Sequence, residues 1–395
     1  MGKAITSLST LFILSLITRY YGESGTGILT IVLAYLGFFI IAVDLGFNAY
    51  LMPKLLDNAE DIWRKLFGLR ILIAIVLMFV AGGVIFLLPN YDPLVYQLVL
   101  IGVVGALIQP AFFVTANAIF QAKLRYDLSI ISSSIGSVLT FLLIYIAILS
   151  KTSLAIIMFC YLAGWLTTAI ISITLSSRFI KNLTPLFDLS FMLKLVKGAW
   201  PISLALLLNV LYFRVDTFLL SFLKPFADVG IYNLSYSIFQ AALVLPTFIM
   251  NSYYPMMIES FKKNQQQFFS QLRLASFGMA LIGVLGIIAT ILLSGLIIIA
   301  ITGGRGFEGS KDALVILSFG FPAYFVSALL MWTLVVMKRY KEMVAIYFIG
   351  LLFNIFTNLI FIPQYSYLAT SWITGLSEYL ILLLQVITIL VLSRR

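Results

Sequence analysis

Five charged residues lie inside or at the edge of long apolar runs, where a charge is expensive to bury. Asp44, Arg214, Asp216 and Glu378 fall within such runs, and Arg19 ends the first of them. A charge at the centre of a bilayer costs at least about 2.5–3.5 kcal/mol on insertion scales, so each side chain needs a partner, water or a ligand. A guanidinium can grip phosphate oxygens through two hydrogen bonds. A buried carboxyl must be paired, hydrated or protonated, so it is a candidate ion-coupling group.

The expected chemistry of these residues differs with their positions. Arg214 is predicted to hold a phosphate group, and Asp216 lies about 200° away around the same helix, so the two should not pair directly. Salt bridges to other helices, which would fix a resting state, remain the alternative for both. Asp216, Glu378 and Asp44 form the set of candidate ion-coupling or gating residues. For Asp44, pinning the protein at its cytoplasmic face is favoured over ion coupling.

The elements that carry these residues are predicted to be membrane-spanning helices. Hydrophobic residues make up 62% of the chain and charged residues 10%, with a mean hydropathy of +1.10. A helix needs about 20 apolar residues to span the hydrocarbon, and the runs are too long and uniform for barrel strands. The fold class is therefore an all-α integral membrane protein with twelve transmembrane helices. The predicted spans are residues 4–18, 28–49, 71–88, 95–120, 128–149, 154–175, 199–223, 231–253, 274–301, 313–337, 343–362 and 367–392.

The chain repeats itself, which indicates two homologous halves. Residues 110–114 (PAFFV) return as 322–326 (PAYFV), and an Arg-Tyr pair follows each copy, at Arg125 and at Arg339. Several such matches in the same order argue for a duplication, a construction that many transporters share. We predict two six-helix lobes related by a pseudo-twofold axis. The N-terminal lobe spans residues 1–187, and the C-terminal lobe spans residues 188–395, beginning with an amphipathic helix on the membrane surface.

Basic residues predict the orientation of the chain. With a cytoplasmic N-terminus, most of the 25 lysines and arginines fall in inside segments, among them Lys3, Lys65 and Arg70. This agrees with the positive-inside rule and places both termini in the cytoplasm of a multi-pass cell-membrane protein. The formal charge of +10 is explained by topology and by contact with anionic membrane lipids. Binding of nucleic acid is not predicted.

Several residues and motifs that enzymes and metal sites commonly use are absent from the sequence, which limits the classes of function to consider. The chain has no histidine, and its single cysteine, Cys160, lies in an apolar span where simple packing is expected. Residues 304–311 (GRGFEGSK) resemble a phosphate-binding loop, but the order Gly-Ser-Lys fails the motif. No loop is long enough for a soluble catalytic domain. We therefore predict a protein that is not an enzyme and has no metal or cofactor, driven by an ion gradient or by the gradient of its own substrate.

Two sets of segments resemble a known family. They are residues 19–27 (RYYGESGTG) and 44–48 (DLGFN) in the first half, and 195–201 (LVKGAWP), 213–216 (FRVD), 229–233 (VGIYN) and 354–363 (NIFTNLIFIP) in the second. These are similar to polysaccharide flippases of the MOP superfamily, the Wzx-type O-antigen flippases, which are related to the MATE exporters and the lipid II flippases. The resemblance covers essentially the whole chain, and its motifs are mostly structural.

The resemblance implies two lobes around a central cavity that opens alternately to each side of the membrane. The substrate would be a polyprenyl-diphosphate-linked oligosaccharide, moved from the cytoplasmic to the outer leaflet for cell-surface polysaccharide synthesis. Since the first spans of each lobe line the cavity in this family, Asn209 and Gln240 are expected to join Arg214 in binding the substrate. Arg19 would meet phosphate or lipid headgroups at the cavity mouth. Expected partners are membrane lipids, glycan polymerase or ligase machinery, and H⁺ or Na⁺ as a coupling ion.

Two other classes of function compete with a flippase. A MATE-like cation-coupled exporter of small molecules predicts an acidic cavity in the first half, where only Asp44 offers support. A membrane glycosyltransferase or polymerase needs a sizeable outer loop with catalytic residues, which the chain lacks. A cationic, wide cavity favours a lipid diphosphate, and an acidic, narrow cavity favours an exported cation. We predict a net positive cavity.

Overall fold

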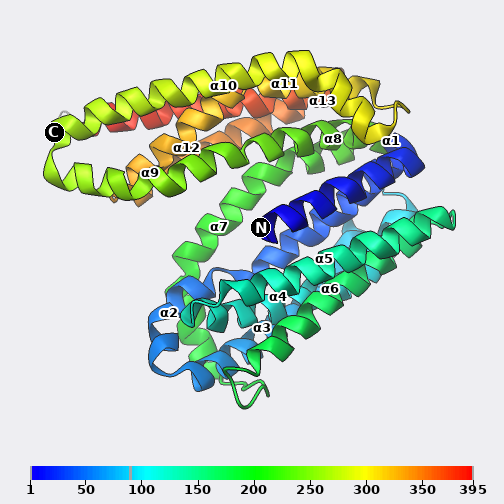
Figure 1. The fold of residues 1–395 in the computed structure, drawn as a ribbon. Helices are drawn as coiled ribbons and strands as arrows, with labels where there is room; N and C mark the ends of the chain where they lie inside the picture. The colour runs from blue at the N-terminus through cyan, green and yellow to red at the C-terminus, as the bar shows by residue number, and fades with distance from the viewer. Residues whose placement is uncertain (1, 89–90, 394–395) are drawn as a thin grey trace. The chain divides into compact units, whose positions relative to one another are not determined.

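The computed structural model describes residues 2–88 and 91–393, and within these ranges every regular element is a helix (Figure 1). The helices fall into two compact units. The first holds residues up to Tyr20 together with Ile28–Val210, and the second holds Tyr21–Gly27 and the chain from Leu211 onward. The predicted all-helical class is confirmed.

The first unit is built around α4. It contains most of α1 (Gly2–Asp44), α2 (Phe47–Asp57), α3 (Ala59–Val84), the 3₁₀ turn η1 (Ile85–Leu87), α4 (Pro93–Ala122), α5 (Tyr126–Leu149), α6 (Leu154–Ser176) and the start of α7 (Leu189–Leu223). Helix α4 packs against α3 and α6, and α5 packs against α6. The core shared by α2, α3 and α4 is rich in aromatic residues, with Trp63, Phe67 and Phe120 buried together.

The second unit is built around α12 and α13. It contains the rest of α7, then α8 (Phe226–Ala242), α9 (Val244–Lys263), α10 (Gln265–Thr302), α11 (Glu308–Ser318), α12 (Phe321–Val336) and α13 (Tyr340–Ser393). Helix α12 packs against α10 and α13, while α11 packs against α8 and α13.

Two of the longest helices are interrupted and turn back on themselves. Helix α1 breaks at Gly22 (φ 65°, ψ −164°), and α13 breaks at Ser366 (φ 49°, ψ −134°). At 54 residues α13 would be about 80 Å long if straight, far more than a bilayer's apolar thickness of about 30 Å. A Cβ on Gly350 would meet the side chain of Ile381 at 2.7 Å. Since these two residues are almost equally distant from Ser366 in sequence, α13 is a helical hairpin. In Figure 1 the two halves of α1 likewise run back past each other.

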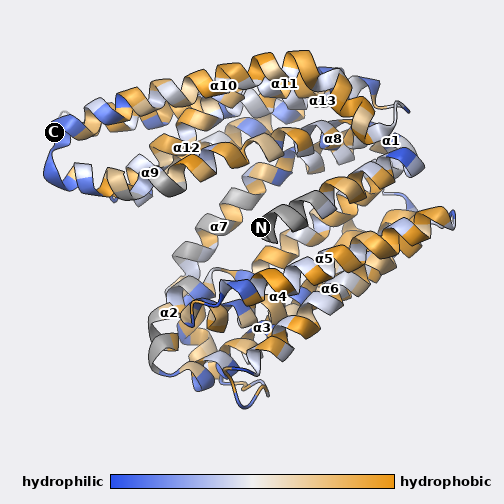
Figure 2. Cartoon of the chain, viewed as in Figure 1, coloured by the Kyte–Doolittle hydropathy of each residue, from blue (hydrophilic) through white to orange (hydrophobic). Residues whose placement is uncertain are grey.

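Eight of the described helices are long and apolar enough to cross a membrane, or nine if α11 and α12 form one span bent by 46°. Apolar residues cover the lengths of these helices, and hydrophilic residues gather at their ends and connections (Figure 2). The predicted number was twelve. The counts differ because α1 and α13 each contain two predicted spans yet count once, and because α7 is not among the eight.

Glycines allow α5 and α6 to pack with their backbones in close approach. A Cβ on Gly136 would overlap the Thr168 hydroxyl and lie 2.8 Å from the Gly164 carbonyl oxygen. A Cβ on Gly164 would overlap the Thr140 hydroxyl in the same way. Small residues at matching positions are how helices pack tightly in membranes.

Replacing Gly136 with valine should therefore destabilise the first unit, because the added methyl groups force α5 away from α6. Overpacking of a tight contact costs about 1–3 kcal/mol. The measurement is the thermal midpoint of the purified protein in detergent. Gly37→Val in α1 is the matched control, since nothing lies within 4 Å of a Cβ at Gly37. Equal midpoints for the two variants would contradict the expected crowding.

Helix α7 begins at a capping residue that also joins it to α3. The Asp188 carboxylate accepts hydrogen bonds from the Phe191 backbone N–H at 3.0 Å and the Ser190 hydroxyl at 2.8 Å. It lies 3.3 Å from the Lys65 ammonium. The buried residues Met192 and Leu195 then belong to the core of the first unit. The predicted surface helix thus continues directly into α7, and the predicted lobe boundary at residues 187 and 188 stays a prediction.

The cap of α7 should make stability depend on acid pH. The hydrogen bonds from Phe191 and Ser190, with help from Lys65, lower the pKa of Asp188 from 3.8 to about 2. Since the unfolded chain binds this proton more readily, the stabilisation is complete above about pH 4 and is lost as the pH falls through about 2. Asp188→Asn keeps a capping oxygen but does not titrate. We expect its thermal midpoint to fall less than that of the unchanged protein between pH 4 and pH 2.5, and identical slopes would contradict this expectation.

Candidate functional site

Asp216 lies at the centre of a buried polar cluster in the second unit. Its side chain is on α7 and is 3% exposed. The Asn358 amide donates to its Oδ1 at 3.0 Å, and the Thr374 hydroxyl donates to its Oδ2 at 2.8 Å. The Tyr232 hydroxyl also lies 3.2 Å from Oδ2. Helix α8 and both halves of α13 therefore converge on one carboxylate of α7.

One oxygen acceptor of the cluster is left without a donor in the described part of the chain. Asn358 Nδ2 also donates to Asn354 Oδ1 at 3.0 Å, whereas Asn358 Oδ1 is buried and has no hydrogen-bond partner among the described residues. Within the same part of the chain, no lysine or arginine forms an ion pair with Asp216. A buried carboxylate held only by neutral donors carries a large desolvation cost. Oxygens from a carboxylate, two amides and a hydroxyl suit a hard cation, and a proton would also remove the charge.

A second buried carboxyl lies one helical turn away from the first. The Tyr212 hydroxyl on α7 donates to Glu378 Oε2 on α13 at 2.7 Å, and Glu378 is 3% exposed. Tyr212 precedes Asp216 by four residues, and Glu378 follows Thr374 by four, so two polar rungs join the antiparallel helices. We call these four residues with Asn354, Asn358 and Tyr232 the polar seam. Of the predicted site residues, the structure brings Asp216 and Glu378 together along this seam.

The predicted substrate-binding residues lie on α1, α7 and α8. Arg214 is half-buried on α7, and no ion pair links it to Asp216 in the part of the chain described, in agreement with their positions around the helix. Gln240 is half-buried near the end of α8, and Arg19 is exposed on α1 in the first unit. The side chain of Asn209 lies outside the described residues. The substrate role of all four stays a prediction.

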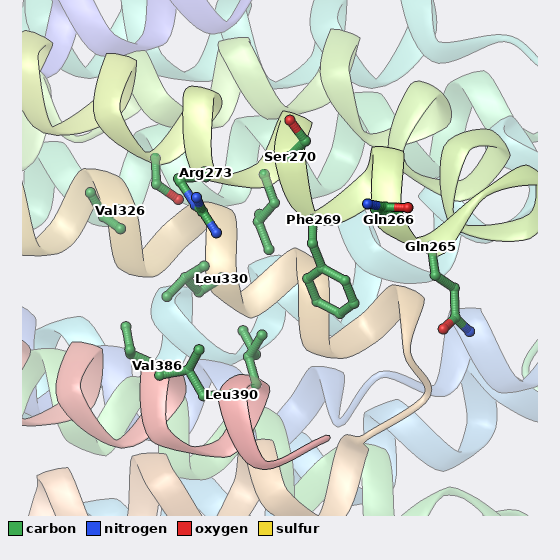
Figure 3. A pocket seen from close by; sticks show the side chains of 12 residues that line it. Gln265, Gln266, Phe269, Ser270, Arg273, Val326, Leu330, Val386 and Leu390 are labelled. Carbon is green, nitrogen blue, oxygen red and sulfur yellow. The ribbon is translucent and has the colours of Figure 1, made fainter. Parts of the chain in front are cut away.

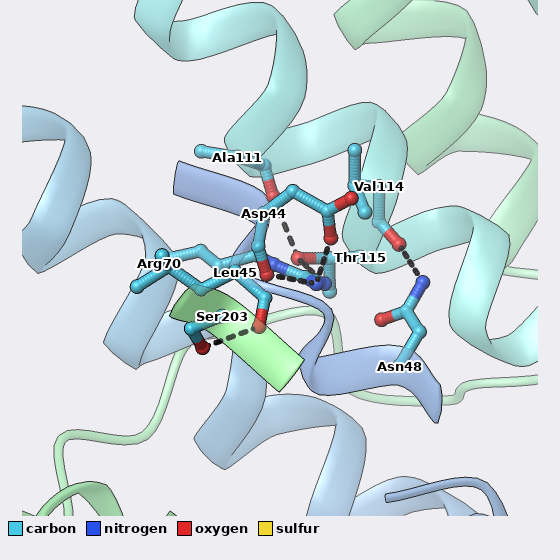
Figure 4. Close-up of polar contacts among 8 residues, drawn as sticks. All are labelled: Asp44, Leu45, Asn48, Arg70, Ala111, Val114, Thr115 and Ser203. Atoms are coloured by element: carbon cyan, nitrogen blue, oxygen red, sulfur yellow. Dashed lines mark hydrogen bonds and ion pairs between the residues drawn. The ribbon is translucent and has the colours of Figure 1, made fainter. Parts of the chain in front are cut away.

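Asp44 forms an ion pair inside the first unit (Figure 4). Its Oδ1 lies 3.1 Å from Arg70 Nη2, and Arg70 is completely buried although the Asp44 side chain is 41% exposed. Arg70 also donates at 3.4 Å to the Thr115 hydroxyl. The Arg70 Nε has no partner among the described residues. The pair joins the end of α1 to α3 and α4.

Neighbouring hydrogen bonds attach the connection after α1 and the start of α2 to other helices. The Asn48 amide donates to the Val114 carbonyl oxygen at 2.9 Å, and the Ser203 hydroxyl of α7 donates to the Leu45 carbonyl oxygen at 2.7 Å (Figure 4). Asp44 is thus held among three helices of one unit. This geometry is that of a structural pin, and its functional role stays a prediction.

Sequence reasoning missed several members of these clusters. Arg70 was expected only as one basic residue of a cytoplasmic segment, and its burial within α3 was not predicted. Arg70 follows Leu66 by four residues and Trp63 by seven, and both of these residues are buried. This helical spacing was the signal that Arg70 lies on the same buried face. Asn354 and Asn358 were expected only to bond across helices. Nothing in the sequence distinguished Tyr212, Tyr232 and Thr374 from other hydroxyls in the spans.

Comparison with known proteins identifies the family. Residues 1–261, about two thirds of the chain, match the model of a family described as polysaccharide biosynthesis protein. This chain belongs to that family. No curated protein matches the chain.

Solved structures show that the family member has the fold of MOP-superfamily transporters. The lipid II flippase MurJ, in an inward closed conformation, is 15% identical with a TM-score of 0.81, covering 98% of this chain and 86% of MurJ. An inward-facing multidrug MATE transporter is 10% identical with a TM-score of 0.77, covering 98% of this chain and 96% of its own. A third match is a MOP-superfamily transporter from Pyrococcus furiosus, whose binding pocket is described as reversed in polarity. It is 12% identical with a TM-score of 0.66, and the match covers 100% of this chain and 92% of the transporter. Together with its long apolar helices, this fold indicates that the chain is a multi-pass membrane protein.

Proposed function

We propose that this protein flips a polyprenyl-diphosphate-linked oligosaccharide from the cytoplasmic to the outer leaflet of the cell membrane. The observation that carries the proposal is membership of the polysaccharide biosynthesis protein family. The similarity in fold to a lipid II flippase supports it. Only the head needs a polar path, since the tail is already soluble in the membrane.

The proposed topology has twelve spans with both termini in the cytoplasm. The hairpin in α13 and the reversal in α1 support it, because each turns one continuous helix into two crossings. Arg214, Gln240, Asn209 and Arg19 are the proposed contacts to the diphosphate and sugar head.

We further propose that a cation, Na⁺ or H⁺, binds at the polar seam and drives the transport cycle. Asp216 supplies the charge, and the unpartnered Asn358 Oδ1 and the Thr374 hydroxyl supply neutral oxygens. Because α7, α8 and both halves of α13 meet at this carboxylate, loading it with a cation would change how tightly these helices pack. Glu378, held by Tyr212 one turn away, is the proposed second acid of the same path.

The experiment that tests the flippase is the leaflet distribution of lipid-linked sugar in a strain that lacks this gene. We expect the sugar to accumulate on the cytoplasmic leaflet and to return to the outer leaflet when the gene is restored. An unchanged distribution of the lipid-linked sugar between the leaflets would contradict the proposed flippase function.

A MATE-like exporter of small molecules is the second candidate, supported by structural similarity to a multidrug MATE transporter. It predicts that the same deletion strain becomes sensitive to cationic drugs while its lipid-linked sugar is unaffected. The two functions are therefore separated by measuring both properties in one strain.

A further inference from the structure

A pocket of about 860 Å³ opens among α10, α12 and α13 of the second unit, and none of its lining residues belongs to the polar seam (Figure 3). This volume is typical of sites that hold a small organic molecule, about 300–1,000 Å³. The pocket is lined by Gln265, Gln266, Phe269, Ser270, Leu272, Arg273, Ser276, Val326, Leu330, Val386, Ile389 and Leu390.

One side of the pocket is polar and cationic. Arg273 is the single charged side chain among its described lining residues, and no carboxylate opposes it there. Gln265, Gln266 and Ser270 add exposed amides and a hydroxyl from the first turns of α10. In Figure 3 the Arg273 side chain reaches from α10 toward α12 and α13. Since no carboxylate among the described lining residues opposes this guanidinium, the local charge favours an anion.

The opposite side of the pocket is aliphatic and continues to the surface of the unit. Val326, Leu330 and Ile389 are 5–9% exposed, and they form the floor without any polar atom in their side chains. Val386 and Leu390 are 37% and 53% exposed, so the wall stays open at its edge. An aliphatic wall of this kind would gain nothing from a soluble phosphate or nucleotide, but it would be covered favourably by a hydrocarbon chain.

We propose that this pocket binds one anionic phospholipid. The phosphate lies at Arg273, with hydrogen bonds available from Gln266 and Ser270, and one acyl chain lies along α12 and α13 over Leu330 and Val386. A guanidinium is suited to this contact because it holds phosphate oxygens through two parallel bonds. The proposal does not depend on transport of an oligosaccharide, since it concerns a membrane lipid bound by residues outside the polar seam.

Binding of lipid to the full-length protein tests the proposal. The purified protein in detergent is titrated with phosphatidylglycerol or phosphatidylcholine, and retained lipid is counted by native mass spectrometry. We expect one phosphatidylglycerol to be retained in preference to phosphatidylcholine. Arg273→Gln should weaken its binding about tenfold or more, because a charged hydrogen bond contributes about 1.5–3 kcal/mol. Val386→Trp should block the acyl chain and reduce the binding of both lipids.

Arg178→Gln is the matched control, because Arg178 is another exposed arginine but lies in the first unit, and it should bind lipid as the unchanged protein does. The thermal midpoint of each variant shows whether it is folded. Equal retention of the two lipids, or unchanged binding by Arg273→Gln, would overturn the proposal. Stronger retention of a polyprenyl phosphate than of phosphatidylglycerol would also overturn it, by assigning the pocket to a polyprenyl chain.

Discussion

Replacing Asp216 with asparagine should abolish cation-driven transport while leaving the protein folded. The change removes the negative charge of Asp216 and keeps the shape of its side chain. Even the outer partners of a bound ion contribute 10- to 100-fold to affinity, so loss of the carboxylate itself should weaken cation binding by at least about 100-fold. Binding of radioactive sodium to purified protein, and transport as a function of sodium concentration and pH, measure this effect.

The hydrogen bonds of the cluster explain why folding should survive that substitution. The Asn358 amide can still donate to an amide oxygen at the position of Asp216 Oδ1. The hydroxyls of Thr374 and Tyr232 can rotate and accept from the amide nitrogen at the position of Oδ2. With a buried charge removed, the thermal midpoint should stay equal or rise.

Asp312→Asn is the matched control for charge, because Asp312 is an exposed carboxylate of the same unit. It should transport normally. Full sodium- or proton-dependent transport by Asp216→Asn would contradict the proposed cation site at the polar seam. The proposed flippase function would not be affected by that result, because the gradient of the substrate itself could drive transport.

The fold could be predicted from the sequence because membrane helices have a strong composition signal. Every predicted span falls within a helix or a pair of consecutive helices, since about 20 apolar residues have no other stable state in lipid. The reversal at Ser366 could not be predicted. A serine with φ near 49° carries no sequence signal, and only the contact between Gly350 and Ile381 reveals the hairpin.

The charged residues of the polar seam could be predicted from the sequence, but their hydrogen-bond partners could not. Asp216 and Glu378 were found because a carboxyl inside an apolar run is conspicuous. Their partners, Thr374 and Tyr212, come from helices far away in sequence, and hydroxyls are common in spans. The burial of Arg70 was missed for a related reason. Four other basic or acidic residues precede Arg70 in α3, so this part of the sequence resembles a polar loop. The periodicity of the helix nevertheless places Arg70 on its buried face.

The ion pair between Asp44 and Arg70 should produce the largest change in stability. Asp44→Ala leaves the Arg70 guanidinium buried with no opposite charge, which costs about 3–5 kcal/mol in pairs of this kind. Because the Asp44 side chain is 41% exposed, we expect a value near the lower end of that range. Thermal unfolding of purified protein in detergent measures the loss. A change below about 0.5 kcal/mol, the size of an exposed pair, would contradict the expected burial of the charge.

A double substitution separates stability from function at this pair. Asp44→Ala with Arg70→Met replaces the buried cation by an apolar chain of similar length, which is often neutral or stabilising. The unpartnered Arg70 Nε already leaves the guanidinium incompletely bonded, so its removal should recover most of the stability lost in Asp44→Ala. If the pair acts only as a pin, the double variant should also transport normally. If the pair is a gate, the double variant should be stable and inactive, because the switch between paired and open states no longer exists.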